Sequence, residues 1–97
     1  MAEGYEGEVH LAAEGAPPRT AHAALVARFD PLAGRVVWTG RVAAAVPPRT
    51  QVAVTTPHGT ARAEATERDV WGNTRIRGLD RPPFPVELLD GGDPPGR

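Results

Sequence analysis

Two carboxylates flank an arginine in the sequence Glu67-Arg68-Asp69. A carboxylate held beside a substrate can act as a general base, and a guanidinium group can hold an anion. The same residue types also build tight turns, because an Asp side chain accepts hydrogen bonds from the backbone N–H groups that follow it and an Arg pairs with a neighbouring acid. We favour the turn and keep Asp69 and Glu67 as candidate catalytic residues.

The three histidines lie far apart in the sequence, at His10, His22 and His58. They lack the short spacing, such as H-x-H, with which histidines on one element bind a metal. We therefore expect no metal site and no bound cofactor. Pro-His-Gly is typical of a tight turn, which explains His58 by itself. His58 is nevertheless a third candidate catalytic residue, because it lies in one of the distinctive sequence blocks described below.

The aromatic residues are candidates for a ligand-binding site. Trp38 and Trp71 are each expected in the core or at a pocket, where the indole N–H needs a hydrogen-bond partner. We favour the core for Trp38, whereas Trp71 is as well explained by a ligand slot between alanine-rich strands. Tyr5 is expected to face inward, and Arg68 could hold an anion. The candidate ligand-binding residues are therefore Trp71, Trp38, Tyr5 and Arg68.

Four further arginines alternate along expected strands, at Arg28, Arg41, Arg75 and Arg77. An inward arginine face would form a site for an anion or a carbonyl group. Polar residues on neighbouring strands, such as Glu64, indicate instead that these arginines face solvent.

The composition excludes several kinds of chemistry. The chain contains no Cys, Lys or Ser, which rules out disulfides, thiolate metal sites, lysine Schiff bases and a serine nucleophile. The net charge of −1 argues against nucleic acid as the main partner. No apolar run approaches the ~20 residues of a membrane span, and the first residues do not form a signal peptide. We expect a cytoplasmic location and no membrane partner.

Short runs of alternating apolar and polar residues, separated by Pro and Gly, indicate the elements that position these side chains. This pattern is typical of an all-β sandwich or barrel. We expect a small six- to seven-stranded antiparallel barrel in meander order, with a sandwich as the alternative. The expected strands are residues 5–11, 21–29, 35–43, 51–56, 60–67 and about 71–78, with an edge strand at best in residues 82–86.

Residues 1–89 are expected to form a single barrel domain, and residues 90–97, rich in Gly, Pro and Asp, a disordered tail. Bulky apolar residues are few in this chain of 97 residues. A lean core often gains stability from a partner surface, so we expect a homodimer.

Several sequence blocks resemble an actinobacterial family of small domains whose function is not assigned. Members of that family stand alone or are appended to flavin-dependent monooxygenases of the Baeyer–Villiger type. The resemblance implies a role in oxidative or secondary metabolism and a flavin monooxygenase as a possible partner, but it supplies no catalytic residues. The blocks are Phe29-x-Pro31-x-x-Gly34-x-x-x-Trp38-x-Gly40-Arg41, Thr56-Pro57-His58-Gly59, Glu67-Arg68-Asp69-x-Trp71-Gly72, Ile76-x-Gly78 and Arg81-Pro82-Pro83-Phe84-Pro85-Val86.

Three functions remain open from the sequence. The first is a non-catalytic accessory domain that binds a small apolar metabolite. The second is a cofactor-free enzyme, such as a cyclase or isomerase of natural-product biosynthesis, that needs only a dry pocket and one acid or base. The third is a dimerisation or docking module. The chain has no Gly-rich dinucleotide loop and no P-loop, so it is not itself a monooxygenase.

Overall fold

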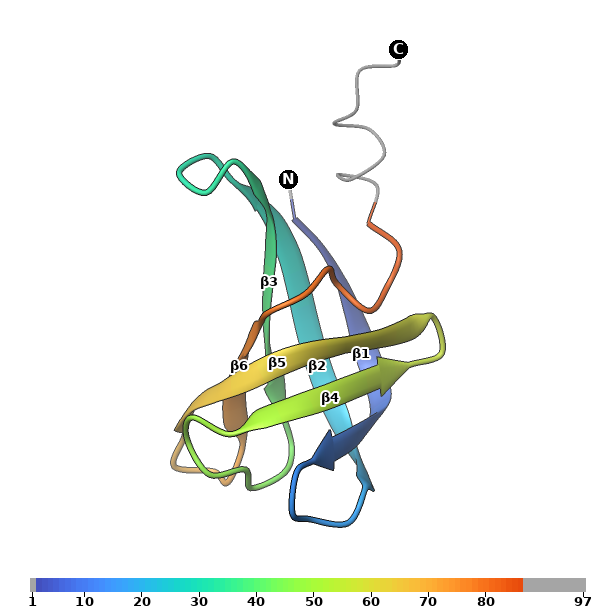
Figure 1. Cartoon of the computed structure of the whole chain (residues 1–97), viewed down its shortest axis with the longest axis vertical. Helices are drawn as coiled ribbons and strands as arrows, with labels where there is room; N and C mark the ends of the chain where they lie inside the picture. Colours follow the sequence, from blue (N-terminus) through green and yellow to red (C-terminus); the bar gives the residue numbers. More distant parts are fainter. Residues whose placement is uncertain (1, 87–97) are drawn as a thin grey trace.

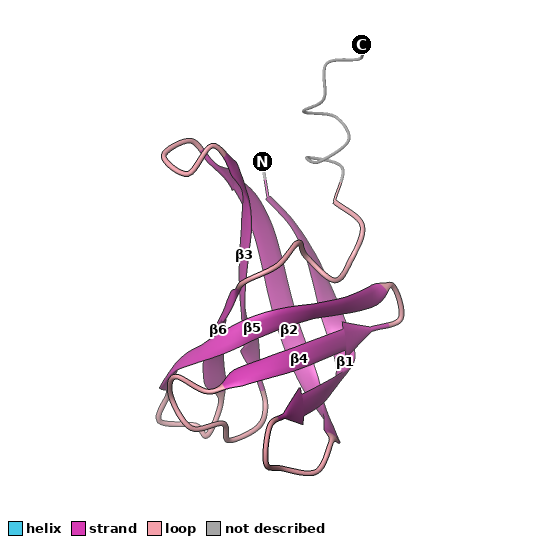
Figure 2. Ribbon diagram, in the orientation of Figure 1, coloured by secondary structure: helices cyan, strands magenta, loops and turns pink. Residues whose placement is uncertain are grey.

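The computed structural model describes residues 2–86, which form six strands and no helix. This confirms the all-β fold class (Figure 2). In this part of the chain, no helix is long and apolar enough to cross a membrane. The strands are β1 (Ala2–Ala13), β2 (Arg19–Asp30), β3 (Arg35–Val42), β4 (Gln51–Thr56), β5 (Gly59–Arg68) and β6 (Thr74–Gly78).

The six strands close into an antiparallel barrel in the order β1-β2-β3-β6-β5-β4. The barrel is confirmed, but its meander order is wrong. A meander would pair β3 with β4 and β6 with β1, whereas β3 pairs with β6 and β1 with β4. The fold therefore consists of two three-stranded meanders joined along both edges, and β4 and β5 run across the front of the β1-β2-β3 half (Figure 1).

The connection between β3 and β4 explains this order. Residues 43–50 contain two consecutive prolines and are too long for a tight hairpin. The linker contacts β6, where the amide of Val46 donates to Oγ1 of Thr74 over 3.1 Å. It then reaches β5, where the amide of Arg49 donates to the carbonyl oxygen of Ala65 over 2.7 Å. The chain thus passes β6 and β5 before β4 begins, which places β4 on the far side of β5.

Three strands, β1, β2 and β6, have a boundary two or more residues from the expected one, and β2 begins at Arg19 instead of residue 21. β1 extends beyond residues 5–11 at both ends, and β6 begins at Thr74 instead of near Trp71. Residues 82–86 form no strand, because three of these residues are prolines and proline cannot donate to a ladder. Within residues 2–86 the barrel therefore has six strands and not seven. The expected tail at residues 90–97 lies outside the described residues.

Side chains fill the interior of the barrel. Trp38 and Ile76 are each 1% exposed, and the alanines of β5 face inward beside them. Small residues make room for large ones: a Cβ at Gly78 would overlap the Trp38 indole, and a Cβ at Gly40 would overlap the Leu25 side chain. The small inward residues therefore serve close packing.

The segment after β6 covers one end of the core. Phe84 and Val86 are 6% and 4% exposed, and Oγ1 of Thr56 donates to the carbonyl oxygen of Pro83. Asp80 fixes the start of this segment, because its carboxylate accepts three hydrogen bonds, of 3.0 to 3.1 Å, from the backbone and guanidinium of Arg62. The hydrogen bonds from Arg62 lower the pKa of Asp80.

Candidate functional site

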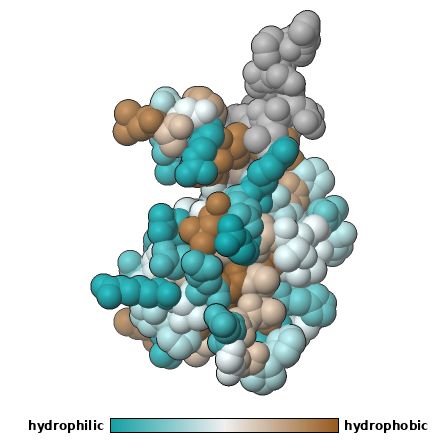
Figure 3. Space-filling model, viewed as in Figure 1, coloured by the Kyte–Doolittle hydropathy of each residue, from teal (hydrophilic) through white to brown (hydrophobic). Residues whose placement is uncertain are grey.

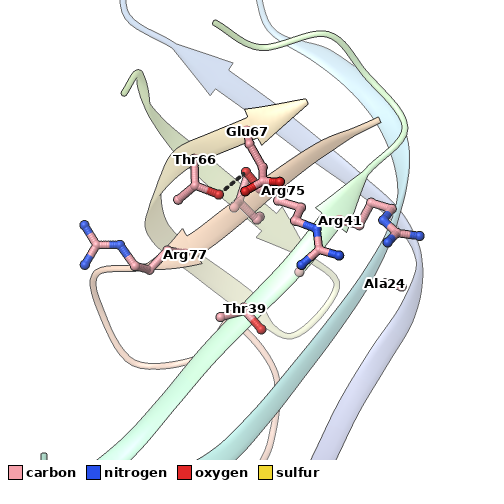
Figure 4. A pocket seen from close by; sticks show the side chains of 9 residues that line it. Ala24, Thr39, Arg41, Thr66, Glu67, Arg75 and Arg77 are labelled. Atoms are coloured by element: carbon pink, nitrogen blue, oxygen red, sulfur yellow. Dashed lines mark hydrogen bonds between the residues drawn. The ribbon is translucent and has the colours of Figure 1, made fainter. Parts of the chain in front are cut away.

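A hollow of about 390 Å³ lies on the outer face of the barrel, over β2, β3, β6 and β5. It is open to solvent, and most of its lining side chains are polar or charged. Figure 4 shows these side chains rising from four adjacent strands. The lining residues are Ala24, Thr39, Gly40, Arg41, Thr66, Glu67, Arg75, Ile76 and Arg77.

An irregularity in β5 builds one wall of the hollow. Ala65 pairs with Ile76 and Glu67 with Arg75, so Thr66 has no partner of its own in the ladder. Thr66 and Glu67 are consecutive, yet both are exposed and both line the hollow. Oγ1 of Thr66 donates to the carbonyl oxygen of Arg75 over 3.3 Å. Such bulges re-aim side chains and are frequent beside functional sites.

Two arginines on neighbouring strands line the hollow. Arg41 of β3 lies directly opposite Arg75 of β6, and like charges in that arrangement destabilise a sheet. Arg77 points away from both in Figure 4 and is ion-paired with Glu64. Glu67 of β5 also lies opposite Arg75 in the ladder, so the acids and arginines around the hollow balance in number. Arg75 is nevertheless the lining arginine whose guanidinium forms no ion pair with a described residue.

Asp69 lies beside the hollow and closes the β5–β6 turn. Its Oδ1 accepts hydrogen bonds from the amides of Trp71 and Asn73, at 2.8 and 3.0 Å. Its Oδ2 lies 3.6 Å from Nε of Arg41. Burial alone raises the pKa of Asp69, but the hydrogen bonds from Asn73 and Trp71 and the charge of Arg41 outweigh it and lower that pKa. A carboxylate so stabilised is a poor general base, which agrees with the turn interpretation.

Trp71, which the sequence predicted to lie in the core or at a pocket, lies elsewhere. Trp71 lies neither in the core nor in an interior slot: it is 80% exposed, next to Val70 at 87%. The physical reason is that the chain turns at Asp69, before β6 begins, so that Trp71 stands at the tip of the turn. Arg68 is exposed at the end of β5 and does not line the hollow.

The remaining candidates lie elsewhere. Trp38 is a core residue whose Nε1 donates to the carbonyl oxygen of Asp80 over 2.8 Å. The ring of Tyr5 meets the ring of His58 edge-on, with centroids 6.1 Å apart, and the hydroxyl of Tyr5 donates to the carbonyl oxygen of Glu8. The structure thus brings Glu67 and Asp69 to one side of the barrel, and His58 with Tyr5 to another.

Sequence reasoning placed Arg41 and Arg75 on the exterior, which the structure confirms. It missed that they are neighbours, because only the β3–β6 pairing shows this. It also missed Thr39 and Thr66, for which the sequence carries no signal beyond their polar positions in strands. Among the described residues, no group of three or more His, Asp or Glu side chains could hold a metal ion.

A family model described as a domain of unknown function (DUF4873) matches residues 2–86. The match covers most of the chain, which therefore belongs to this family. No curated protein and no solved structure shows a significant match to the chain. The expected membership in a family of small domains without an assigned function is thereby confirmed.

Proposed function

We propose that this member of the DUF4873 family is a non-catalytic accessory domain that binds a small carboxylate-bearing metabolite in the hollow on its outer face. The observation that carries the proposal is the position of Arg75: the residue lies opposite Arg41 in the β3–β6 ladder, and its guanidinium forms no ion pair with a described residue. A carboxylate bound between the two groups would neutralise this charge, since guanidinium groups bind carboxylates with paired hydrogen bonds.

The packing of the barrel supports an outer site over an interior one. The inward side chains fill the space between the strands, and two glycines are in contact with larger side chains where even a methyl group would overlap. An apolar metabolite would need an empty interior. The hollow instead offers guanidinium groups, the hydroxyls of Thr39 and Thr66, and the carboxylate of Glu67. This combination favours a ligand with an anionic group and a hydrogen-bond donor.

The geometry gives less support to a cofactor-free enzyme. That hypothesis requires an enclosed pocket from which water is excluded, together with an acid or base near neutrality. The hollow is open to solvent, Asp69 is held as a carboxylate by the turn, and His58 lies on another hairpin. Glu67 is the one candidate catalytic residue that lines the hollow, and we assign it the role of accepting a hydrogen bond from the ligand.

The proposal keeps the wider setting expected from the sequence. The resemblance to domains appended to flavin-dependent monooxygenases supports an accessory role in oxidative or secondary metabolism in the cytoplasm. In that setting the domain would hold a carboxylate-bearing substrate or product close to the enzyme.

Titration with succinate, followed by NMR of the backbone amides, tests the proposal. We expect dissociation constants in the millimolar range, on the order of 1 mM, because the site is exposed and exposed ion pairs contribute little. The shifts should concentrate at residues 39–41, 66–67 and 75–77. Arg75→Gln should weaken binding about fivefold.

Arg28→Gln is the matched control, because Arg28 is an exposed strand arginine that does not line the hollow. It should leave succinate binding unchanged. Equal losses in both variants would show that succinate responds only to net charge and would overturn the proposal. Shifts confined to interior residues would overturn it as well, because they would place the ligand inside the barrel.

A further inference from the structure

The barrel is closed by pairing along only part of β3. Residues 35–42 pair with β2 on one side, but β6 pairs only with residues 39–42 on the other. Residues 35–38 therefore have no strand on their second side among the described residues. An edge of this kind presents unpaired N–H and C=O groups that can pair with another chain.

After β6 the chain turns away from β3, which leaves this edge unpaired. After Gly78, the amide of Leu79 donates to the carbonyl oxygen of Arg62 over 2.8 Å, and the carboxylate of Asp80 is held by the guanidinium of the same arginine. These bonds draw the chain toward β5 and away from β3. A groove of about 660 Å³ remains between the two, lined by Arg35, Val36, Leu79, Asp80 and Arg81.

The face of the sheet beside this edge is apolar and exposed. Phe29 lies directly opposite Val36, on the side of the sheet that carries the core residues Leu25 and Ala27. Beyond the barrel this side is uncovered, since Phe29 is 52% exposed. Leu32 at the tip of the hairpin is 99% exposed. In Figure 3 the hairpin stands clear of the body, with apolar surface at its tip and a hollow beneath it.

The charges at the groove are only partly balanced. Asp30 lies opposite Arg35 in the β2–β3 ladder, but its Oδ1 accepts hydrogen bonds from two backbone amides of the β2–β3 turn, and it forms no ion pair with a described residue. Arg35 and Arg81 are both exposed and form no ion pair with a described residue. Asp80, the one acid in the lining, is already bound by Arg62. Two copies of the chain meeting at this edge would bring four arginines together, so charge complementarity favours an acidic occupant over a second copy.

From these features we propose that residues 35–38 are a docking edge for an extended acidic segment of a partner protein, which adds a strand to β3. Strand addition uses backbone hydrogen bonds for affinity and alternate side chains for specificity. The segment should alternate apolar and acidic residues, because successive side chains of a strand point to opposite faces. Its apolar side chains would lie on Phe29 and Val36, and its acids on the side of Arg35. The inference is independent of the carboxylate site.

A short capped peptide in which Val and Glu alternate is the probe. We expect it to bind with a dissociation constant on the order of 10–100 μM, to shift the amides of residues 35–38 and 79–81, and to slow their hydrogen exchange. The same peptide N-methylated at every second residue keeps its side chains but loses the strand pairing, and should not bind. Arg35→Gln and Arg81→Gln should each weaken binding about threefold to fivefold.

Arg75→Gln is the matched control, because Arg75 lies in the outer hollow and not at the edge; it should leave peptide binding unchanged. Equal binding of the N-methylated peptide, or loss of binding in Arg75→Gln, would overturn the proposal. Tighter peptide binding after truncation at Val86 would show that the chain's own C-terminal residues are the occupant. A dimer with protected amides at residues 35–38 would show that it is a second copy. Either result would also overturn the proposal, and failure here would leave succinate binding unaffected.

Discussion

Gly78→Ala places a methyl group against the indole of Trp38. The added Cβ would lie within 3.0 Å of three ring atoms, closer than real Cβ atoms approach their neighbours. Trp38 cannot move aside easily, because it is 1% exposed and its Nε1 is bonded to the carbonyl oxygen of Asp80. We therefore expect the full cost of overpacking a core, about 1–3 kcal/mol.

That cost is large for a domain of this size, whose total stability is about 5–15 kcal/mol. It corresponds to a fall in Tm of roughly 5–20 °C for a domain of this length. Thermal unfolding followed by circular dichroism measures it. The cost should shrink when Trp38→Leu removes the ring first, because residues in contact are not additive.

Gly72→Ala is the control for the backbone. Gly72 has φ of 86° and nothing within 4 Å of an added Cβ. The loss of stability in Gly72→Ala therefore arises from the backbone of the turn, and it should be the same whether position 38 carries Trp or Leu. If Gly78→Ala cost nothing, or cost the same in both backgrounds, the interior would contain free space around Trp38 and the filled barrel would be refuted.

Three further predictions concern the charged residues. Asp69→Ala should lower Tm and Asp69→Asn should lower it less, because Asn also caps turns; an unchanged Tm in both variants would refute the turn role. Asp80→Asn should destabilise the domain at neutral pH. Because Arg62 lowers the pKa of Asp80, the stabilisation is fully present above the unfolded pKa of about 4. The difference between wild type and variant in urea unfolding should begin to shrink below that pH and disappear as the pH falls through the lower folded pKa; a constant difference would contradict the pairing. Arg75→Thr removes one of two arginines that are cross-strand partners in the β3–β6 ladder. It should leave Tm unchanged or higher while succinate binding weakens; a clear loss of Tm would assign Arg75 a structural role.

Local patterns predicted the strands well. Alternation indicated that Arg28 faces solvent, which the structure confirms, since the period of two is a property of the strand itself. The turn role of Asp69 was also predictable, because an Asx turn forms within a few residues. These features depend only on residues that are close to one another in the sequence, so the sequence alone is enough to predict them.

Features that depend on distant pairing could not be predicted. In the expected meander, Arg41 would have faced β4, and nothing would have placed it against Arg75. The actual order depends on the hydrogen bonds that the linker at residues 43–50 makes to β6 and β5. The position of Trp71 was predicted wrongly for a related reason. Strand propensity predicted that β6 begins near Trp71, whereas these residues form the turn that Asp69 caps.

Native mass spectrometry of the protein as purified from the cell tests most directly whether the ligand site lies on the outer face of the barrel and not in its interior. The account predicts a mass equal to that of the chain, or to a whole multiple if the expected homodimer forms, with no small molecule retained through gentle desolvation. A stoichiometric small molecule that stays bound until the barrel unfolds would require a site inside the barrel and would contradict the account.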